Sequence, residues 1–185
     1  MPDQHRLFFA QLPFLVAATT DETGGPVATL LTGEPGFAAS PDPRTLAIAA
    51  ATRDPAGRRL VTGAPIGLLG IEPHTRRRNR ANGRVMFGGD EGLVVAVEQS
   101  FGNCPQYIHP RLLALDPEAP LDVEVFAGLD AAARALVATA DTFFVATSSG
   151  LGVTGGGVDV SHRGGPAAFV QIDGDVLTIP DYRGN

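Results

Sequence analysis

The apolar residues of this chain come in short runs bounded by glycine or proline, and this pattern limits the folds open to it. Such runs occupy residues 14–20, 45–51 and 66–71, a length that suits strands better than helices. The chain has 23 glycines and 15 prolines to supply the intervening turns. Short apolar runs separated by turn residues are typical of β-rich proteins. We therefore expect a mainly β fold with a few short helices.

Composition limits the class of protein. With 185 residues and 44% hydrophobic content, the chain can bury one good core, or two small ones, and is not disordered. A net charge of −6 argues against a general nucleic-acid binder. All 14 basic residues are arginine, which looks like a coding bias, so no single arginine indicates guanidinium-specific chemistry.

Targeting and redox signals are few. The first nine residues lack the basic-then-apolar pattern of a signal peptide, and no apolar run approaches the ~20 residues that span a membrane. The single cysteine, Cys104, excludes an internal disulfide and a cysteine-cluster metal site. We expect a cytoplasmic protein with no membrane and no nucleic-acid partner.

Turn and cap residues place the elements. We expect a helix over 4–12 with Leu7, Phe8 and Phe9 packed inward, and a helix that begins at Asp54 and ends near Gly63. A third helix should cover 131–140, capped by Asp130. The expected strands cover 14–20, 27–32, 45–51, 66–71, most of 75–87 with a turn or bulge at 82–83, 93–97, 142–147, and three short segments within 155–185.

The chain contains an internal similarity. Residues 14–20 align with 143–149, residues 27–33 with 158–164, and residues 42–48 with 173–179, and a short helix precedes both copies. The period of about 130 residues is too long for a solenoid and indicates two copies of one β-unit. We expect a first unit over 1–110, a linker and helix over 111–140, and an incomplete second unit over 141–185. An open third strand in the second unit predicts pairing in a dimer, or a chain that is a piece of a longer protein.

Two groups of polar residues suggest a binding site. In a strand, Arg76, Arg78 and Arg80 would share one face and suit a phosphate, whose oxygens match guanidinium donors in pairs. The alternative is a solvated face whose arginines pair with acidic side chains. Residues 161–165 offer a hydroxyl, an imidazole, a guanidinium and two flexible amides, which suits a phosphate or a ring carbonyl. The alternative here is a hairpin turn with surface polar residues.

Other reactive residues give weaker signals. Cys104 lies near Tyr107 and His109, but a buried structural cysteine is the preferred interpretation over a nucleophile. The four histidines lack metal-ligand spacing. Residues 152–157 are glycine-rich but lie between two strands, which is wrong for a dinucleotide-binding loop.

At these residues the chain resembles the pyridoxamine 5'-phosphate oxidase-like superfamily of FMN-binding split β-barrels, and more narrowly a bacterial flavin-nucleotide-binding group. Three segments carry the resemblance: the arginine strand with Asn-Gly at 76–83, the QS-x-x-NCP-x-YI segment at 99–108, and DVSHRGG…IPD-x-x-GN at 159–185. They occur in order, and together they are specific. The similarity covers residues 8–185. The chain departs from the pattern at Ala167 and Ala168, which replace the usual Pro-Gly.

The resemblance implies a six-stranded split barrel, a homodimer with FMN between its subunits, and a phosphate held by arginine and hydroxyl side chains. By position, the implied cofactor-binding residues are Ser161, His162, Arg163, Gly164, Tyr182, Arg183, Asn185, Arg76 and Arg78. The first unit would then act as scaffold and the second would carry the flavin site.

The expected function is that of an FMN-dependent oxidoreductase acting on a small substrate, with catalytic residues unassigned and no metal. Two alternatives remain open: a binding module for flavin or another phosphate ligand without turnover, and a structural dimerisation domain that has lost its flavin. The sequence leaves the substrate open, and it leaves open whether FMN, a deazaflavin-type cofactor or haem is the ligand.

Overall fold

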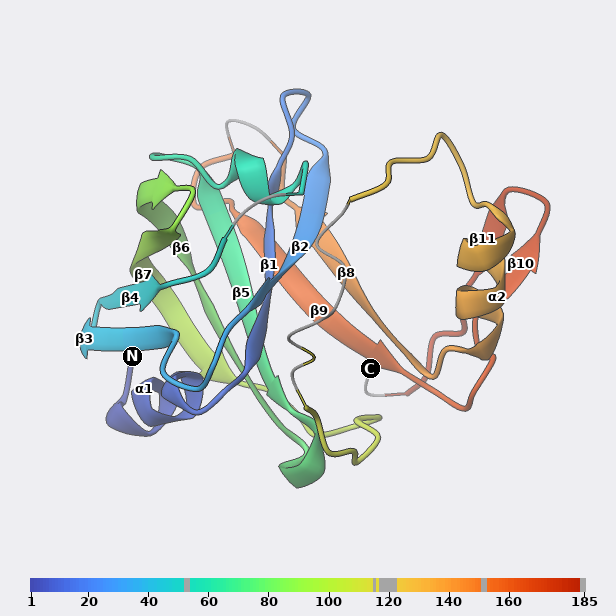
Figure 1. Ribbon diagram of the computed structural model, residues 1–185, viewed down its shortest axis with the longest axis horizontal. Coiled ribbons are helices and arrows are strands. Elements are labelled where there is room, and N and C mark those ends of the chain that lie inside the picture. The colour runs from blue at the N-terminus through green and yellow to red at the C-terminus, as the bar shows by residue number, and fades with distance from the viewer. Residues whose placement is uncertain (52–53, 115, 117–122, 151–152, 184–185) are drawn as a thin grey trace.

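A curled, seven-stranded antiparallel sheet forms most of the molecule (Figure 1). The computed structural model describes residues 1–51, 54–114, 116, 123–150 and 153–183. The strands, in sheet order, are β2 (Pro26–Thr32), β1 (Phe14–Thr20), β5 (Pro65–Glu72), β6 (Arg77–Gly89), β7 (Gly92–Gly102), β4 (Thr45–Ile48) and β3 (Ala38–Asp42). The expectation of a mainly β, barrel-like fold is confirmed.

One hydrophobic core lies inside the curled sheet. Every second residue of a strand faces the interior, and all seven strands contribute: Leu15, Ala17, Leu31, Ala38, Leu46, Ile48, Ile66, Leu68, Ala81, Val85, Leu93, Val95 and Val97. Helix α1 (Asp3–Ala10) adds Phe8 and Phe9, as expected. Leu7 was expected to face inward but is 71% exposed, because the helix turns that position away from the core.

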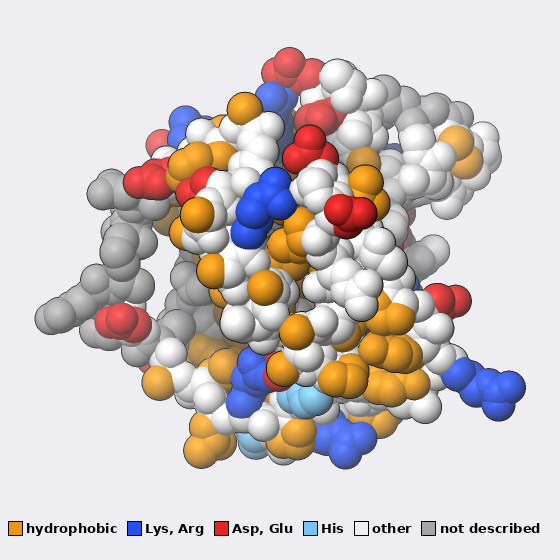
Figure 2. All heavy atoms as spheres, turned by 90° about the vertical axis from the view of Figure 1, so that its right-hand side faces the viewer, with side chains coloured by type: hydrophobic (Ala, Val, Ile, Leu, Met, Phe, Trp, Pro, Cys, Tyr) orange, Lys and Arg blue, Asp and Glu red, His pale blue; other side chains and the backbone are white. Residues whose placement is uncertain are grey.

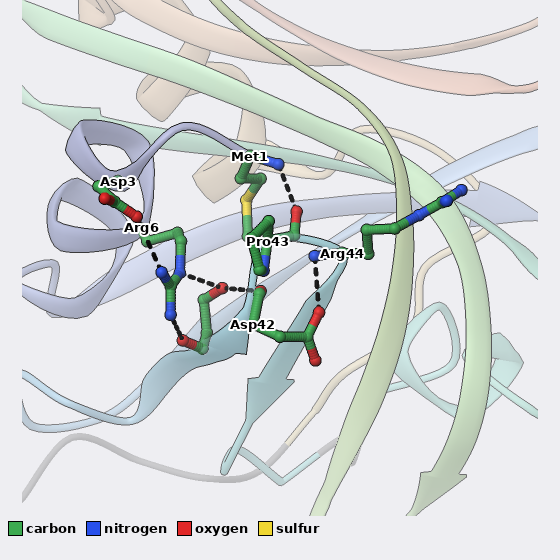
Figure 3. A network of polar contacts seen from close by, with 7 residues as sticks. Met1, Asp3, Arg6, Asp42, Pro43 and Arg44 are labelled. Carbon is green, nitrogen blue, oxygen red and sulfur yellow. Dashed lines mark hydrogen bonds and ion pairs between the residues drawn. The ribbon is translucent and has the colours of Figure 1, made fainter.

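Polar contacts fix α1 and the N-terminus to β3 and to the turn that follows it (Figure 3). The Arg6 guanidinium donates to the Ser40 hydroxyl (3.1 Å), to the Ser40 carbonyl (2.8 Å) and to Asp3 (2.9 Å). The N-terminal amine donates to the Pro43 carbonyl. These contacts hold the two phenylalanines of α1 over one end of the core.

Strands β1 and β5 are buried on both faces, and a second layer explains why. A two-stranded ribbon, β8 (Thr142–Ser148) and β9 (Val158–Gly164), packs across their outer surface. Val158 and Val160 of β9 contact Val16 and Leu69 there. Continuous apolar runs are typical of strands covered on both sides, so the runs 14–18 and 66–71 reflect this packing.

The remaining elements are short. The 3₁₀ turns η1 (Gly57–Arg59) and η2 (Pro73–Thr75) precede β5 and β6, and helix α2 (Ala131–Thr139) precedes β8. Strands β10 (Gln171–Asp173) and β11 (Val176–Thr178) form a separate hairpin near α2. The Asp130 cap is confirmed, since its carboxylate accepts from the Ala133 amide at 2.7 Å.

Helix α2 and β11 expose apolar side chains. No residue of α2 is buried, and Leu136 is 71% exposed. In β11 and just after it, Val176, Leu177 and Ile179 are also exposed. Figure 2 views the side of the molecule on which these elements lie, and apolar side chains are gathered in several places on that face. These elements therefore bury little apolar surface of their own.

Three expected elements differ. The helix expected to begin at Asp54 is only the turn η1, although Asp54 still accepts from the amides of Ala56 (2.9 Å) and Gly57 (3.0 Å). Strand β3, which contains Pro41, was not among the expected strands. Strand β7 runs on to Gly102, five residues beyond the strand expected at 93–97.

The two halves of the chain share one order of elements. Each half has a helix, then two paired strands, then a second pair of strands. The first half consists of α1 and β1 to β4, and the second of α2 and β8 to β11. The second set does not extend the seven-stranded sheet, and its first pair packs on the outside of it. The division into units ending at residues 110 and 140 stays a prediction.

No helix in the described part of the chain has the length and apolar character needed to cross a membrane.

Candidate functional site

The outer face of β6 meets β9, and a buried arginine lies at their contact. Residues 79, 81 and 85 of β6 face the barrel interior or lie beside it, which turns Arg78 outward to β9. The Arg78 Nε donates to the Cys104 carbonyl at 2.8 Å. Its Nη1 contacts the His162 carbonyl at 3.2 Å and His162 Nδ1 at 3.1 Å. Arg78 is only 6% exposed, and these partners are all uncharged oxygens or a ring nitrogen.

Further along the same face, an ion pair joins the two strands. The Arg80 guanidinium donates to Asp159 at 2.6 Å and to the Ser161 hydroxyl at 2.7 Å. The Asn82 amide donates to the other oxygen of Asp159 at 3.1 Å. The alternative of arginines paired with acidic side chains is therefore correct for Arg80, and the described contacts of Arg78 include no carboxylate.

Arg76 does not share this face. It caps η2 in the left-handed conformation, with φ 57°, and β6 begins only at Arg77. The expected alternation of Arg76, Arg78 and Arg80 is wrong at its first member, because the turn breaks the strand period there. Arg76 is exposed and makes no described contact with β9.

The charge around His162 is strongly positive. The pKa of His162 is lowered from 6.5 to about 4. Burial is the largest cause, and the neighbouring charges of Arg78, His109 and Arg163 act in the same direction. Burial also lowers the pKa of Arg78, with Arg80 and Arg163 acting in the same direction. His162 is therefore neutral at pH 7, and its Nδ1 accepts from Arg78.

Arg163 is the least engaged cation of this group. Its one described hydrogen bond is a long 3.5 Å contact from Nη1 to the His162 carbonyl. Asp141, the one acid that raises the pKa of the adjacent His162, is paired with Arg111 at 2.6 Å. Among the described contacts, Arg78 and Arg163 thus lack a carboxylate partner, and the end of β9 that they share favours an anion. We call Arg78, His162 and Arg163 the cationic corner.

Aromatic side chains gather beside the cationic corner. The Tyr107 and Tyr182 ring centroids are 5.4 Å apart, those of Phe169 and Tyr182 are 6.3 Å apart, and Phe143 stacks on Phe169 at 5.7 Å. The Tyr107 hydroxyl donates to the Arg183 carbonyl at 2.9 Å. A cluster of tilted aromatic rings, in which Tyr107 and Tyr182 are partly exposed, therefore adjoins a site that favours an anion.

Gly164 joins the two features by a close approach of backbones. A Cβ at Gly164 would lie 2.1 Å from the Tyr107 carbonyl oxygen. Tyr107 itself has a left-handed backbone, with φ 53°, which is uncommon for a bulky residue. The absence of a side chain at Gly164 thus has a packing reason, whether or not a ligand binds.

The structure brings most of the expected site residues together. Four lie on β9 beside Arg78, and two lie near Tyr107 in the C-terminal segment: Ser161, His162, Arg163 and Gly164, then Tyr182 and Arg183. Arg76 lies apart from them, and Asn185 is outside the described residues. The side chain of Ser161 is engaged with Arg80.

Sequence reasoning missed several partners of this site. Tyr107 and Asp159 lie inside the segments that carry the resemblance, but no spacing rule connects them with β6. His109, whose Nε2–H donates to the Gly165 carbonyl at 2.8 Å, was considered only as a base for Cys104. The expectation of a buried Cys104 is wrong: the residue is exposed, because the chain leaves β7 at Gly102 and runs along the surface.

A small cavity of about 150 Å³ adjoins His162. His109, Thr142 and Phe144 are among its lining residues. Its volume is below the roughly 300 Å³ from which small-molecule pockets usually start. In the described ranges, no group of three or more His, Cys, Asp or Glu side chains is placed to hold a metal ion.

No protein-family model and no curated protein sequence matches this chain. Three solved structures show partial similarity. Group A Streptococcus HupZ is 15% identical over 55% of this chain and 94% of its own, with a TM-score of 0.42, and a variant of it scores 0.44 over 99% of its own chain. The FAD and heme binding protein from Mycobacterium smegmatis is 12% identical over 73% of this chain and 94% of its own, with a TM-score of 0.33. At these identities and scores, the similarities carry no argument about function.

Proposed function

We propose that this chain is an FMN-binding split-barrel protein whose cationic corner holds the flavin phosphate. The observation that carries the proposal is the pair Arg78 and Arg163, which have no described carboxylate partner and lie beside an aromatic surface. Guanidinium groups bind phosphate oxygens two at a time. A ligand that joins an anionic group to a flat ring matches both halves of this arrangement.

The residues fit the phosphate end of FMN better than the ring end. Arg78 is oriented by the Cys104 and His162 carbonyls, and Arg163 is free to turn toward incoming oxygens. The cavity beside His162, at about 150 Å³, is too small for a flavin ring. The ring would therefore lie on the surface formed by Tyr107 and Tyr182, with the buried Phe169 beneath Tyr182.

Such a surface site requires a second chain to cover the ring, so we propose a homodimer. The exposed apolar side chains of α2 and β11 support this part of the proposal, because uncovered apolar patches mark contact surfaces. When bound, FMN supplies the chemistry of moving a hydride or electrons to or from a small substrate. The protein's own part is to bind, orient and exclude water, and it needs no general base.

Absorbance of the protein after incubation with FMN and desalting tests the proposal. We expect a flavin spectrum with near-stoichiometric FMN, and a large loss of flavin in Arg163→Ala with unchanged thermal unfolding. Gln171→Ala, an exposed change on β10, serves as the control. Failure to retain FMN at micromolar concentrations would reject the proposal.

Turnover distinguishes the enzyme from the alternatives. Reduction of bound flavin by a nicotinamide cofactor would support an oxidoreductase, and bound flavin that no such donor reduces would favour a non-catalytic module. A structural role would be favoured if the protein binds no flavin but still forms a dimer, and if Arg163→Ala leaves that dimer unchanged.

A further inference from the structure

A second, polar cavity lies at the opposite end of β9 from the cationic corner. Its volume is about 360 Å³, within the range of small-molecule pockets. It is bounded by the start of β9, the end of β8 and the middle of β6 and β7. The polar side chains that line it include Asn82, Arg84, Glu98, Gln99, Ser148 and Asp159.

A β-bulge shapes the floor of this cavity. Asn82 pairs with Gln99, but the next residue, Gly83, pairs with Val97, so Glu98 is an extra residue in β7. Val95 and Val97 face the core, and regular alternation would place Gln99 inward too. The extra residue turns Gln99 to the outer face, opposite Asn82. Bulges often re-aim a side chain next to a functional site.

The bulge depends on a close backbone approach. A Cβ at Gly83 would lie 1.9 Å from the Ala96 carbonyl oxygen. Only glycine permits this contact, so the sequence Asn82–Gly83 specifies the bulge and, through it, the direction of Gln99.

The two carboxamides of the floor retain unused hydrogen-bonding groups. Asn82 Nδ2 donates to Asp159, which fixes the amide orientation, and leaves Asn82 Oδ1 buried without a hydrogen-bond partner. Such a group is costly unless a ligand or water satisfies it. Gln99 is exposed and makes no described hydrogen bond, so it offers both a donor and an acceptor.

We propose that this cavity binds a small neutral ligand with an amide or imide edge, in which an N–H lies next to a carbonyl. The ligand N–H donates to Asn82 Oδ1, and the Gln99 carboxamide pairs with the neighbouring group. Directly opposed strand residues have Cβ atoms about 5 Å apart, so both side chains reach one ligand edge. The carboxylates of Glu98 and Asp159 are paired with Arg84 and Arg80, so the charges around this cavity are balanced and suit a neutral ligand.

This site is separate from the proposed flavin phosphate site. Asp159 and Arg163 are four residues apart on β9, which corresponds to about 13 Å along the strand. The inference does not rest on flavin binding, and either one can fail without the other.

Uracil and 1,3-dimethyluracil are matched probes, because the second has the same ring without an N–H. We expect millimolar uracil to shift the amide resonances of residues 155–157 and the Gln99 side chain in NMR spectra of the full chain. The dimethyl compound should leave them in place. Equal shifts with both compounds, or no shift with uracil, would overturn the proposal.

Two variants locate the binding. Gln99→Ala should weaken uracil binding about 3- to 10-fold, the value of one hydrogen bond, while the Gln171→Ala control changes nothing. Gly157 lines the cavity, and a Cβ there would meet no atom within 4 Å, so Gly157→Leu should fill the space and abolish binding. Both variants should keep the thermal unfolding of the parent. A folded Gly157→Leu protein that binds uracil normally would contradict the assignment.

Discussion

Arg78 carries a buried charge whose described partners are two carbonyl oxygens and a neutral imidazole. Burial of a charge is costly unless polar groups satisfy it, and the chain meets this cost with the Cys104 carbonyl and with His162. Arg80, two residues further along β6 and on the same face, is instead neutralised by Asp159. Two arginines of one strand thus have different roles, which their shared sequence context does not distinguish.

The lowered pKa of His162 makes the stability depend on pH. The folded protein takes up the His162 proton only near pH 4, whereas the unfolded chain takes it up near 6.5. The unfolded state therefore binds more protons between these values, and stability falls as the pH drops through this window. From pH 7 to 5 we expect a loss of about 2 kcal/mol from this residue.

Urea unfolding of the wild type and of His162→Gln at both pH values measures this contribution. The variant should show a smaller loss by about 2 kcal/mol. His5, whose pKa is also lowered, contributes equally to both proteins. Parallel losses in the two proteins would show that His162 is not the titrating group.

Asp159 is expected to matter for stability. The side chain of Asp159 is 28% exposed, and that of its partner Arg80 is 15% exposed. Asp159→Asn therefore leaves a largely buried guanidinium without its counter-charge. We expect a loss of about 2 kcal/mol in chemical denaturation. In the control Glu98→Gln, the pair with Arg84 is 3.8 Å apart and well exposed, so the loss should stay below about 0.5 kcal/mol. Similar effects of both changes would contradict this ranking.

At the scale of elements, the sequence predicts strands well where pattern and turn residues agree. Strand β1 has its expected bounds, and the bulge at Asn82–Gly83 lies within the expected long strand. The signals fail at β3, because Pro41 argues against a strand there. Strand β3 pairs only with β4, and an edge strand of this kind tolerates proline. The failure at Arg76 has another cause: Arg76 caps η2, so the first of three consecutive arginines belongs to the turn and only the other two belong to β6.

The bulge gives a test at this scale. Gly83→Ala should lower stability by about 2–4 kcal/mol, because its Cβ would collide with the Ala96 carbonyl at 1.9 Å. Gly157→Ala is the matched control, since its Cβ would meet nothing within 4 Å and should change little. Denaturation midpoints compare the two. Equal midpoints would mean that β6 and β7 can pair without the bulge.

At the scale of the whole molecule, the packing of the ribbon β8–β9 on the sheet creates the candidate site. The internal similarity predicted matching element orders, and the structure has them, but nothing in one copy indicates that its strands lie on the outside of the other. That packing brings His162 to Arg78, and Asp159 to Arg80, across more than 75 residues of chain. Local patterns fix each strand, whereas the site depends on contacts between distant strands that no spacing rule describes.

The central proposal is that the cationic corner binds the phosphate of a flavin. Paired fluorescence titrations with FMN and riboflavin test it most directly, because the two ligands differ only in the phosphate. We predict that FMN binds at least about tenfold more tightly than riboflavin, as one charge-assisted phosphate contact provides, and that Arg163→Ala removes the difference. Equal affinity of the two ligands for the wild-type protein, or no binding of either, would contradict the account.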